Sequence, residues 1–353
     1  MNTPQDPSPT EKIPRDSVTW ANAAFYVLSG CCQPLLMTIC RDAGLANSSS
    51  QLYMLFYYIG PALVIIPLLS ERTKWPSTMT ILRGSGIALF DVCSQTLNYT
   101  GASLAGPTIF STVYSSVTIW TAFFSQMLLG RTMNPWQWLA VVIVFGGLAL
   151  AATDSARVGG DVTHGLMLVL LGSAMHALTY VMLEGIMTVG EQKLTAAQNC
   201  AVQGLVAGTC FFLWQLVYTL PRWDDKIGIP MEQAGTTLWT GLGIMVLFAG
   251  ANLVHAMTFL LTLRHFAGGA TSAGVMKGLQ AVLVFVATHL IYCGRTGGEE
   301  MCFTRGKFLS LITVAGGVTA YGFATSMRER TGSRGNQDYQ RIQQDEVQSE
   351  RIT

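Results

Sequence analysis

Long apolar runs constrain this chain more than any other feature of its sequence. A helix needs about 20 mostly apolar residues to cross the hydrocarbon of a bilayer, and its backbone polar groups must bond within the segment. Ten such runs follow one another along the 353 residues. They cover residues 20–40, 51–70, 81–98, 104–129, 135–152, 165–187, 195–219, 237–261, 270–292 and 307–326. The sequence therefore predicts an all-α membrane protein with ten transmembrane helices.

Composition excludes several classes of protein. Half of the residues are hydrophobic, only 12% are charged, and the formal net charge is +1. Because no basic block lies in the body of the chain, nucleic acid is not an expected partner. The sequence contains neither a His-Glu-x-x-His nor a Gly-x-Ser-x-Gly motif, so we expect no intramembrane enzyme, no metal and no cofactor. The expected partners are membrane lipid and a small solute.

The distribution of basic residues predicts the orientation in the membrane. Lysine and arginine are more frequent on the side that holds the N-terminus, and cytoplasmic loops carry such an excess. Residues 1–19 and 327–353 are then cytoplasmic tails, with no cleavable signal peptide expected in the first and disorder expected in the second. The second tail contains Tyr339-Gln-Arg-Ile342, which fits a signal for a sorting adaptor but is short enough to arise by chance. We expect a eukaryotic endomembrane location in the Golgi, the ER or an endosome or lysosome.

Short features recur in the two halves of the chain. A shift of 164 residues places Gly130-Arg131 on Gly294-Arg295, and a shift about six residues longer places Gly146-Gly147 on Gly316-Gly317. Five spans per half is an odd number, so the second half must enter the membrane from the opposite side. Such an inverted repeat is typical of secondary transporters, whose site lies near the midplane between the halves. The predicted halves are residues 20–153 and 154–326.

Residues 102–151 and 268–324 share one pattern: a helix start rich in small residues, an apolar span, a Gly-Arg corner and a span with a Gly-Gly pair. In this pattern the chain resembles the drug/metabolite transporter superfamily (EamA-like) over residues 20–326, and is nearest its nucleotide-sugar and triose-phosphate branch. The resemblance implies exchange or uniport of a hydrophilic metabolite as the two halves rock. It also implies a basic residue in the ninth span, a position that Lys277 matches.

Lys277 is the strongest candidate for a solute contact. It lies too deep in its span to reach the membrane surface comfortably, so it should face a cavity rather than lipid. There its ammonium group could bind a phosphate or carboxylate of the solute. The alternative is a structural ion pair with Glu184 or Asp91. Gln280, in the same segment, is also predicted to contact the solute.

Further polar residues are predicted to line the cavity. Asp91 and His255 are also related by the shift of 164 residues, and could bind a polar ligand or relay a proton; alternatively, each bonds a neighbouring helix. Gln95 shares a helix face with Asp91. Tyr114, at the start of a stripe with Thr118 and Thr121, could bond a sugar or a base, although such stripes are more often packing. Glu184 is expected at the membrane interface.

Two loops on the predicted non-cytoplasmic side carry modification patterns. Cys293 and Cys302 bracket a polar stretch, and an oxidising compartment would allow a disulfide between them; the alternative is two free thiols. Asn47-Ser-Ser49 fits the acceptor pattern for N-glycosylation, but it lies so close to a predicted span that it could remain unmodified.

These features together predict a secondary transporter that moves an anionic, nucleotide-sugar-like or phosphorylated metabolite by alternating access. One alternative is a transporter of a neutral or cationic solute in which Lys277 is structural. A second is a membrane receptor, a chaperone or an intramembrane enzyme that transports nothing. The sequence also allows a homodimer.

Overall fold

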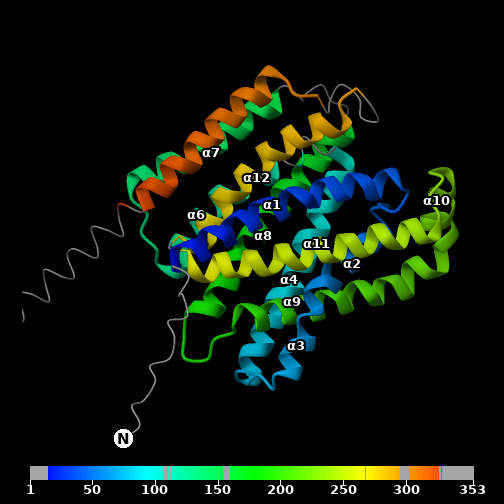
Figure 1. Ribbon diagram of the computed structural model, residues 1–353, viewed down its shortest axis with the longest axis horizontal. Coiled ribbons are helices and arrows are strands. Elements are labelled where there is room, and N and C mark those ends of the chain that lie inside the picture. The colour runs from blue at the N-terminus through cyan, green and yellow to red at the C-terminus, as the bar shows by residue number, and fades with distance from the viewer. Residues whose placement is uncertain are drawn as a thin grey trace, which may run out of the picture.

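The computed structural model describes residues 15–105, 110, 113–153, 160–266, 268–294, 302–325 and 327, and these form packed helices (Figure 1). The helices are α1 (Arg15–Asp42), α2 (Leu52–Ala62), α3 (Ile65–Ser70), α4 (Thr78–Ala105), α6 (Val117–Leu129), α7 (Pro135–Thr153), α8 (Gly160–Thr188), α9 (Ala196–Trp214), α10 (Ile229–Gln233), α11 (Leu238–His265), α12 (Gly269–Tyr292) and a last helix, Arg305–Thr325. Short π and 3-10 turns at Gln215–Thr219, Leu220–Arg222 and Asp224–Gly228 connect α9 to α10.

Within the described part of the chain, seven helical stretches are long and apolar enough to cross a membrane. Two more apolar helices, Val117–Leu129 and Pro135–Leu150, are shorter. The prediction of an all-α membrane protein is confirmed at this level. Helix α4 is long, but it carries the polar residues Asp91, Gln95 and Asn98 in its middle.

Two prolines shape the second predicted span, which the structure divides into α2 and α3. Proline has no backbone N–H, so Pro67 cannot bond the carbonyl group of Leu63, where the regular helix is interrupted. Pro61 likewise leaves the carbonyl oxygen of Tyr57 without a partner inside the helix. The side-chain amide of Asn252, on α11, donates a hydrogen bond to that oxygen. The carbonyl group that Pro61 leaves free within α2 thus joins α2 to α11.

The boundary between the third and fourth predicted spans was wrong. Helix α4 continues to Ala105 instead of ending near residue 98, and α6 begins at Val117. The small side chains at the end of α4 explain the extension. Gly101 lies against the backbone of Gly165 and the side chain of Val169 on α8, and a Cβ atom at Gly101 would collide with both. Close packing on α8 therefore supports this last turn.

Helix α7 and the last helix lie side by side at one edge of the molecule (Figure 1). Their contact is reciprocal: Gly147 packs on Thr313 and Val314, while Gly317 packs on Ile143 and Val144. Each of these pairs is related to the other by a shift of 170 residues, the longer of the two shifts found in the sequence. The two helices thus use equivalent surfaces to contact each other.

Helix α1 lies between α11 and α12 (Figure 1). On one side, the side-chain amide of Asn22 donates to the Thr258 carbonyl and the Thr262 hydroxyl of α11. On the other, the amide of Gln280 on α12 donates to the Tyr26 carbonyl. Trp20, near the start of α1, packs its ring against Phe266, just before α12. Helices α1 and α12 therefore start at the same end of the bundle.

Candidate functional site

A cavity of about 190 Å³ lies between α1, α2, α4 and α12. Its aromatic wall consists of Tyr53, Tyr57, Tyr99, Phe110 and Tyr114. Its polar wall includes Gln33, Thr38, Gln95, Lys277 and Gln280. A pocket with a largely apolar lining and a few convergent polar groups is the usual form of a small-molecule site. We call it the outer cavity.

A smaller cavity of about 70 Å³ adjoins the outer one, and Tyr57, Gln95 and Lys277 line both. Helices α8, α9 and α11 provide most of its remaining wall, including His176, Cys200 and His255. We call it the inner cavity. Lys277 therefore stands at the junction of two connected spaces, each bounded by helices from both halves of the chain.

Lys277 is buried, with 8% of its surface exposed. Its Nζ atom lies 3.1 Å from Nε2 of His255, and 5.8 and 5.9 Å from the ring centres of Tyr26 and Tyr114. Aromatic faces attract a cation at such distances. Within the described residues, no carboxylate oxygen lies within 4.0 Å of this ammonium group. Among the described residues, Lys277 therefore has a nearby imidazole and two rings but no anionic partner.

The ion pair offered as the structural alternative for Lys277 is not formed, because both proposed carboxylates have other partners. Asp91 lies 2.7 Å from Nδ1 of His176, and Glu184 pairs with Arg131. The sequence did not reveal these partners because they are distant along the chain.

The direction of the hydrogen bonds around His255 follows from one carbonyl group. The Ser29 hydroxyl lies 2.6 Å from the Phe25 carbonyl oxygen, which can only accept, so Ser29 donates there. Ser29 Oγ is then an acceptor for the Nδ1–H of His255, 3.1 Å away. This assigns the tautomer from the hydrogen-bond network. It leaves Nε2 of His255 as the acceptor that faces the Lys277 ammonium.

His255 therefore contacts Lys277, and its ring is also stacked on Tyr26 with 5.0 Å between ring centres. The residue lines the inner cavity, where the sequence placed it. Its described contacts give it a role in orienting Lys277. Sequence analysis missed Ser29 and Tyr26, since a serine and a tyrosine in an apolar span carry no signal that separates them from packing residues.

Asp91 lies in a dense polar network in the wall of the inner cavity. Its carboxylate contacts His176 on α8 and accepts a hydrogen bond from the Tyr58 hydroxyl on α2, both at 2.7 Å, and the Ser94 hydroxyl lies 3.2 Å away. Gln95 lies beside it, with its side-chain nitrogen 3.5 Å from the other ring nitrogen of His176. His176 was not predicted as a site residue, although its depth in the sixth span could have identified it.

Gln280 and Tyr114, which the sequence suggested as solute contacts, both line the outer cavity. The amide nitrogen of Gln280 donates to the Tyr26 carbonyl at 2.9 Å, which holds this side chain in the wall. The rest of the predicted hydroxyl stripe is used in packing: Thr118 donates to the Gly274 carbonyl on α12, and Thr121 donates to the carbonyl of Thr118. Of this stripe, Tyr114 is the member that reaches the cavity.

Glu184 was expected at the membrane interface with an exposed carboxylate, and the expected exposure was wrong. Its side chain is fully buried and forms an ion pair with Arg131, which follows α6. It also accepts a hydrogen bond of 2.7 Å from the backbone N–H of Ala270, in the first turn of α12. Gly269 permits this approach, because its φ of +47° is unfavourable for other residues and a Cβ atom there would collide with the carboxylate. The sequence suggested that the Glu184 carboxylate needs solvent to be stable. The ion pair with Arg131, which is distant along the chain, stabilises the carboxylate in its place.

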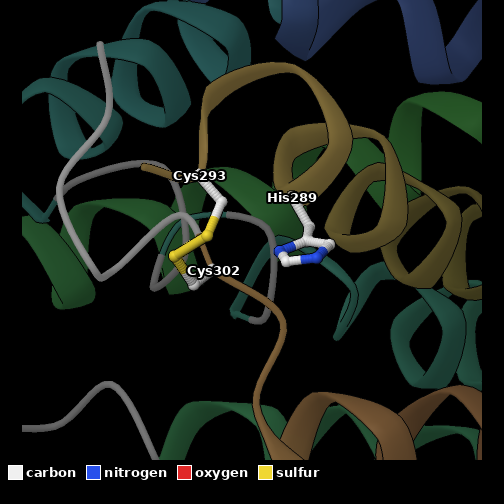
Figure 2. Close-up of side chains that lie close together, drawn as sticks. All are labelled: His289, Cys293 and Cys302. Atoms are coloured by element: carbon white, nitrogen blue, oxygen red, sulfur yellow. A yellow bond between two sulfur atoms is a disulfide. The ribbon is translucent and has the colours of Figure 1, made fainter. Parts of the chain in front are cut away.

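Cys293 and Cys302 are joined by a disulfide, with His289 beside it (Figure 2). The Nδ1 atom of His289 accepts a hydrogen bond of 3.1 Å from the backbone N–H of Phe303. This histidine therefore contacts the segment after the disulfide and does not line either cavity. The three side chains are close enough to ligate a metal ion, but the two thiol groups are already bonded to each other.

The predicted glycosylation site lies in a described loop, whereas the predicted sorting signal does not lie in the described part of the chain. The side-chain oxygen of Asn47 accepts hydrogen bonds from the backbone N–H groups of Ser49 and Ser50 and from the Ser49 hydroxyl, in a loop that Trp214 also contacts. Tyr339 and Ile342, of the proposed sorting signal, lie outside the described residues.

Taken together, the apolar helices and the polar cavities between them define a multi-pass membrane protein. In a comparison with known proteins, residues 24–153 match the EamA-like transporter family, so the predicted resemblance to the drug/metabolite transporter superfamily is confirmed over this segment.

A relative and a solved structure support these findings to different extents. An uncharacterized protein of Schizosaccharomyces pombe is 29% identical over 103 residues, which is 29% of this chain and about a third (32%) of the length of that relative. A crystal structure superposes with a TM-score of 0.61 at 13% identity and covers 89% of this chain and 99% of that one. At this identity the second match shows the fold alone.

Proposed function

We propose that the chain is a secondary transporter that binds an anionic hydrophilic metabolite, nucleotide-sugar-like or phosphorylated, at Lys277. The observation that carries the proposal is a buried ammonium group at the junction of two cavities, with no carboxylate within 4.0 Å among the described residues. Asp91, Gln95, His255, Tyr114 and Gln280 complete the walls around it.

The energy of a buried charge favours an anionic solute. A lysine near the centre of a membrane helix costs roughly 2.5–3.5 kcal/mol on insertion scales, and a buried charge is destabilising unless an opposite charge compensates for it. The imidazole of His255 and the rings of Tyr26 and Tyr114 are neutral partners and compensate only in part. A phosphate or carboxylate group would supply the missing charge.

The aromatic wall favours a solute that also has a planar or ring-shaped part. Tyr57, Tyr99 and Phe110 line the same cavity as Lys277. Aromatic side chains bury large apolar surfaces and stack on flat groups, while their hydroxyl groups can bond a polar edge. An anionic group at Lys277 and a base or sugar against these rings would use both parts of the wall.

Alternating access by two inverted five-helix halves is the mechanism we propose. It is supported by the reciprocal contact of Gly147 and Gly317 and by the shared conformation of the corner glycines Gly130 and Gly294, whose φ angles are +63° and +70°. The halves are residues 20–153 and 154–326. We further propose cytoplasmic termini, an endomembrane location, a sorting adaptor that binds the second tail, and a homodimer as the assembly to test.

Thermal unfolding of the purified protein tests the proposal. Nucleotide sugars, nucleotides, phosphorylated sugars, carboxylates, and neutral and cationic solutes are each added to the wild type and to Lys277→Ala. A solute at 100 times its dissociation constant adds about 2.7 kcal/mol of stability, so binding appears as a higher melting temperature. We expect an anionic solute to stabilise the wild type but not Lys277→Ala.

A matched control is Lys307→Ala, because Lys307 is also a buried lysine but lies outside both cavities. This variant should keep the stabilisation by the anionic solute. If neutral or cationic solutes stabilise the wild type and Lys277→Ala equally, Lys277 is structural and the anionic reading is wrong. If no solute in the panel stabilises the wild type, the reading as a non-transporting receptor or chaperone gains support.

A further inference from the structure

The outer cavity approaches one end of the bundle. Its wall includes Arg41, at the last turn of α1, Ala46, in the loop after α1, and Thr288, near the end of α12. We call this the Arg41 end. Lys277 lies eleven residues before Thr288 on α12, or about 16 Å along the helix at 1.5 Å per residue. The solute site therefore communicates with the Arg41 end over roughly half of α12.

The opposite end of the bundle has a different construction. There, Glu184 of α8 contacts both Arg131, after α6, and the backbone N–H of Ala270, at the start of α12. We call these three residues the Glu184 clasp. Ala270 precedes Lys277 by seven residues, or about 10 Å along α12. Neither cavity includes a residue of the clasp in its wall.

The clasp joins the two halves by charge rather than by apolar packing. Arg131 belongs to the first half, whereas Glu184 and Ala270 belong to the second. A carboxylate at the N-terminus of a helix is favoured by the unpaired N–H groups and the helix dipole there. The side chain of Arg131 is one-third exposed (32%), while that of Glu184 is fully buried, so Arg131 shields the carboxylate from solvent.

We infer that the Glu184 clasp is the gate that closes the solute site at the end opposite Arg41. This inference rests on the proposed transport by alternating access, in which a site open to one side must be closed to the other. Separation of Arg131 from Glu184 would let α6 move away from α8 and from the start of α12. Lys277 would then become accessible from the end that is closed in this structure.

Native cysteines allow a test that needs no solute. Cys200 lines the inner cavity and Cys40 lies in the packed core near the Arg41 end, and both are free thiols that are fully buried (0% exposed). Full-length protein in lipid nanodiscs is treated with a water-soluble maleimide, and the labelling rate of each cysteine is measured by mass spectrometry of its peptide. Opening of the gate should expose Cys200, whereas general unfolding should expose both.

The test variant is Glu184→Gln, which keeps the shape of the side chain but removes its charge. We expect labelling of Cys200 to accelerate about tenfold, since labelling follows the population of the open state, while Cys40 stays unchanged. A second thiol introduced by Thr38→Cys lies in the outer cavity wall at the Arg41 end. Its labelling should slow in the Glu184→Gln background, because opening at one end accompanies closure at the other.

Asp42→Asn is the matched control. It removes an exposed ion pair with Arg41 at the open end, and labelling of Cys200 should not change. Arg131→Lys keeps the charge but lacks the forked guanidinium group, so it should accelerate labelling of Cys200 less than Glu184→Gln does. It is the alternative test variant if Glu184→Gln does not fold.

Three results would overturn the gate. In the first, the labelling of Cys200 does not change. In the second, Cys200 and Cys40 accelerate together, which indicates loss of the fold. In the third, Cys200 accelerates without slower labelling of the Thr38→Cys thiol, which indicates local fraying. None of these results depends on solute binding, so the Lys277 proposal is judged separately by its own thermal assay.

Discussion

At the scale of single residues, the site depends on the order of donors and acceptors around Lys277. Ser29 donates to a backbone carbonyl, which makes it an acceptor for His255, and this in turn makes His255 an acceptor for Lys277. The direction of each hydrogen bond follows from the one before it. The Ser29 hydroxyl, which does not itself contact Lys277, thus determines which atom of His255 faces the Lys277 ammonium group.

Replacement of Ser29 should reveal this dependence. Ser29→Ala leaves Nδ1 of His255 without its acceptor, and an unsatisfied buried group costs about 1–3 kcal/mol. We expect a lower free energy of unfolding by roughly this amount, measured by thermal unfolding, and a smaller stabilisation by any anionic solute.

Two variants control for this effect. Ser29→Thr keeps the hydroxyl group and should keep the behaviour of the wild type. Ser85→Ala removes a hydroxyl group for which the structure gives a bond to the carbonyl group of its own helix. It should have little effect. A loss in Ser85→Ala as large as that in Ser29→Ala would show that the His255 contact contributes nothing special.

The sequence predicted which polar residues line a cavity better than it predicted their partners. The depth of Lys277 in an apolar segment was enough to place it against a cavity, because lipid is a poor solvent for an ammonium group. The partner of Asp91 could not be read in the same way, since His176 lies 85 positions away on another helix. Glu184 was misplaced for the same reason: the arginine that permits its burial is distant in sequence.

At the scale of helices, glycine determines how closely the elements approach. Gly60 of α2 lies against the backbone of Ala249 on α11, and Gly204 of α9 lies against the backbone of Pro61 and Ala62. In membranes, small residues allow close helix packing, which replaces the hydrophobic driving force of water. Helix α2, which carries Tyr57 into the cavities, is thereby held between α9 and α11.

The pair of α7 and the last helix provides a direct test of this packing. Gly147→Ala and Gly317→Ala each place a Cβ atom against the opposite helix, and we expect each to lower the free energy of unfolding by about 1–3 kcal/mol. Gly146 and Gly316 are the neighbouring residues, and a Cβ atom at either would meet nothing within 4 Å. Gly146→Ala and Gly316→Ala should therefore be neutral or slightly stabilising in thermal unfolding. Equal losses at all four positions would contradict the reciprocal contact.

Helix positions followed well from hydropathy, but helix ends did not. The interruption between α2 and α3 could have been read from Pro61 and Pro67. The extension of α4 to Ala105 could not, because it depends on how closely Gly101 approaches Gly165 and Val169 of α8. Hydropathy indicates whether a segment lies in lipid or in water. Where its last helical turn ends depends on the helix that packs against it.

At the scale of the whole molecule, the two ends of the bundle differ in a way that fits the proposed orientation. The disulfide of Cys293 and Cys302 follows α12, whose last turns border the Arg41 end. With cytoplasmic termini, this end faces the non-cytoplasmic compartment, where disulfides persist. The Glu184 clasp then faces the cytoplasm. The structure would thus represent a state accessible from the non-cytoplasmic side.

The redox state of these two cysteines tests the orientation. Protein isolated from cells under conditions that block thiol exchange is alkylated before and after reduction, and the peptides are compared by mass spectrometry. We expect Cys293 and Cys302 to be alkylated only after reduction, because an oxidising compartment keeps them paired. Cys32 and Cys93 are free thiols, so after unfolding in detergent they should not require the reductant, and they serve as the internal reference. Alkylation of Cys293 and Cys302 without reduction would mean that the loop faces the reducing cytoplasm. The Glu184 clasp would then face the lumen, and the gate would control access to Lys277 from the lumen instead of from the cytoplasm.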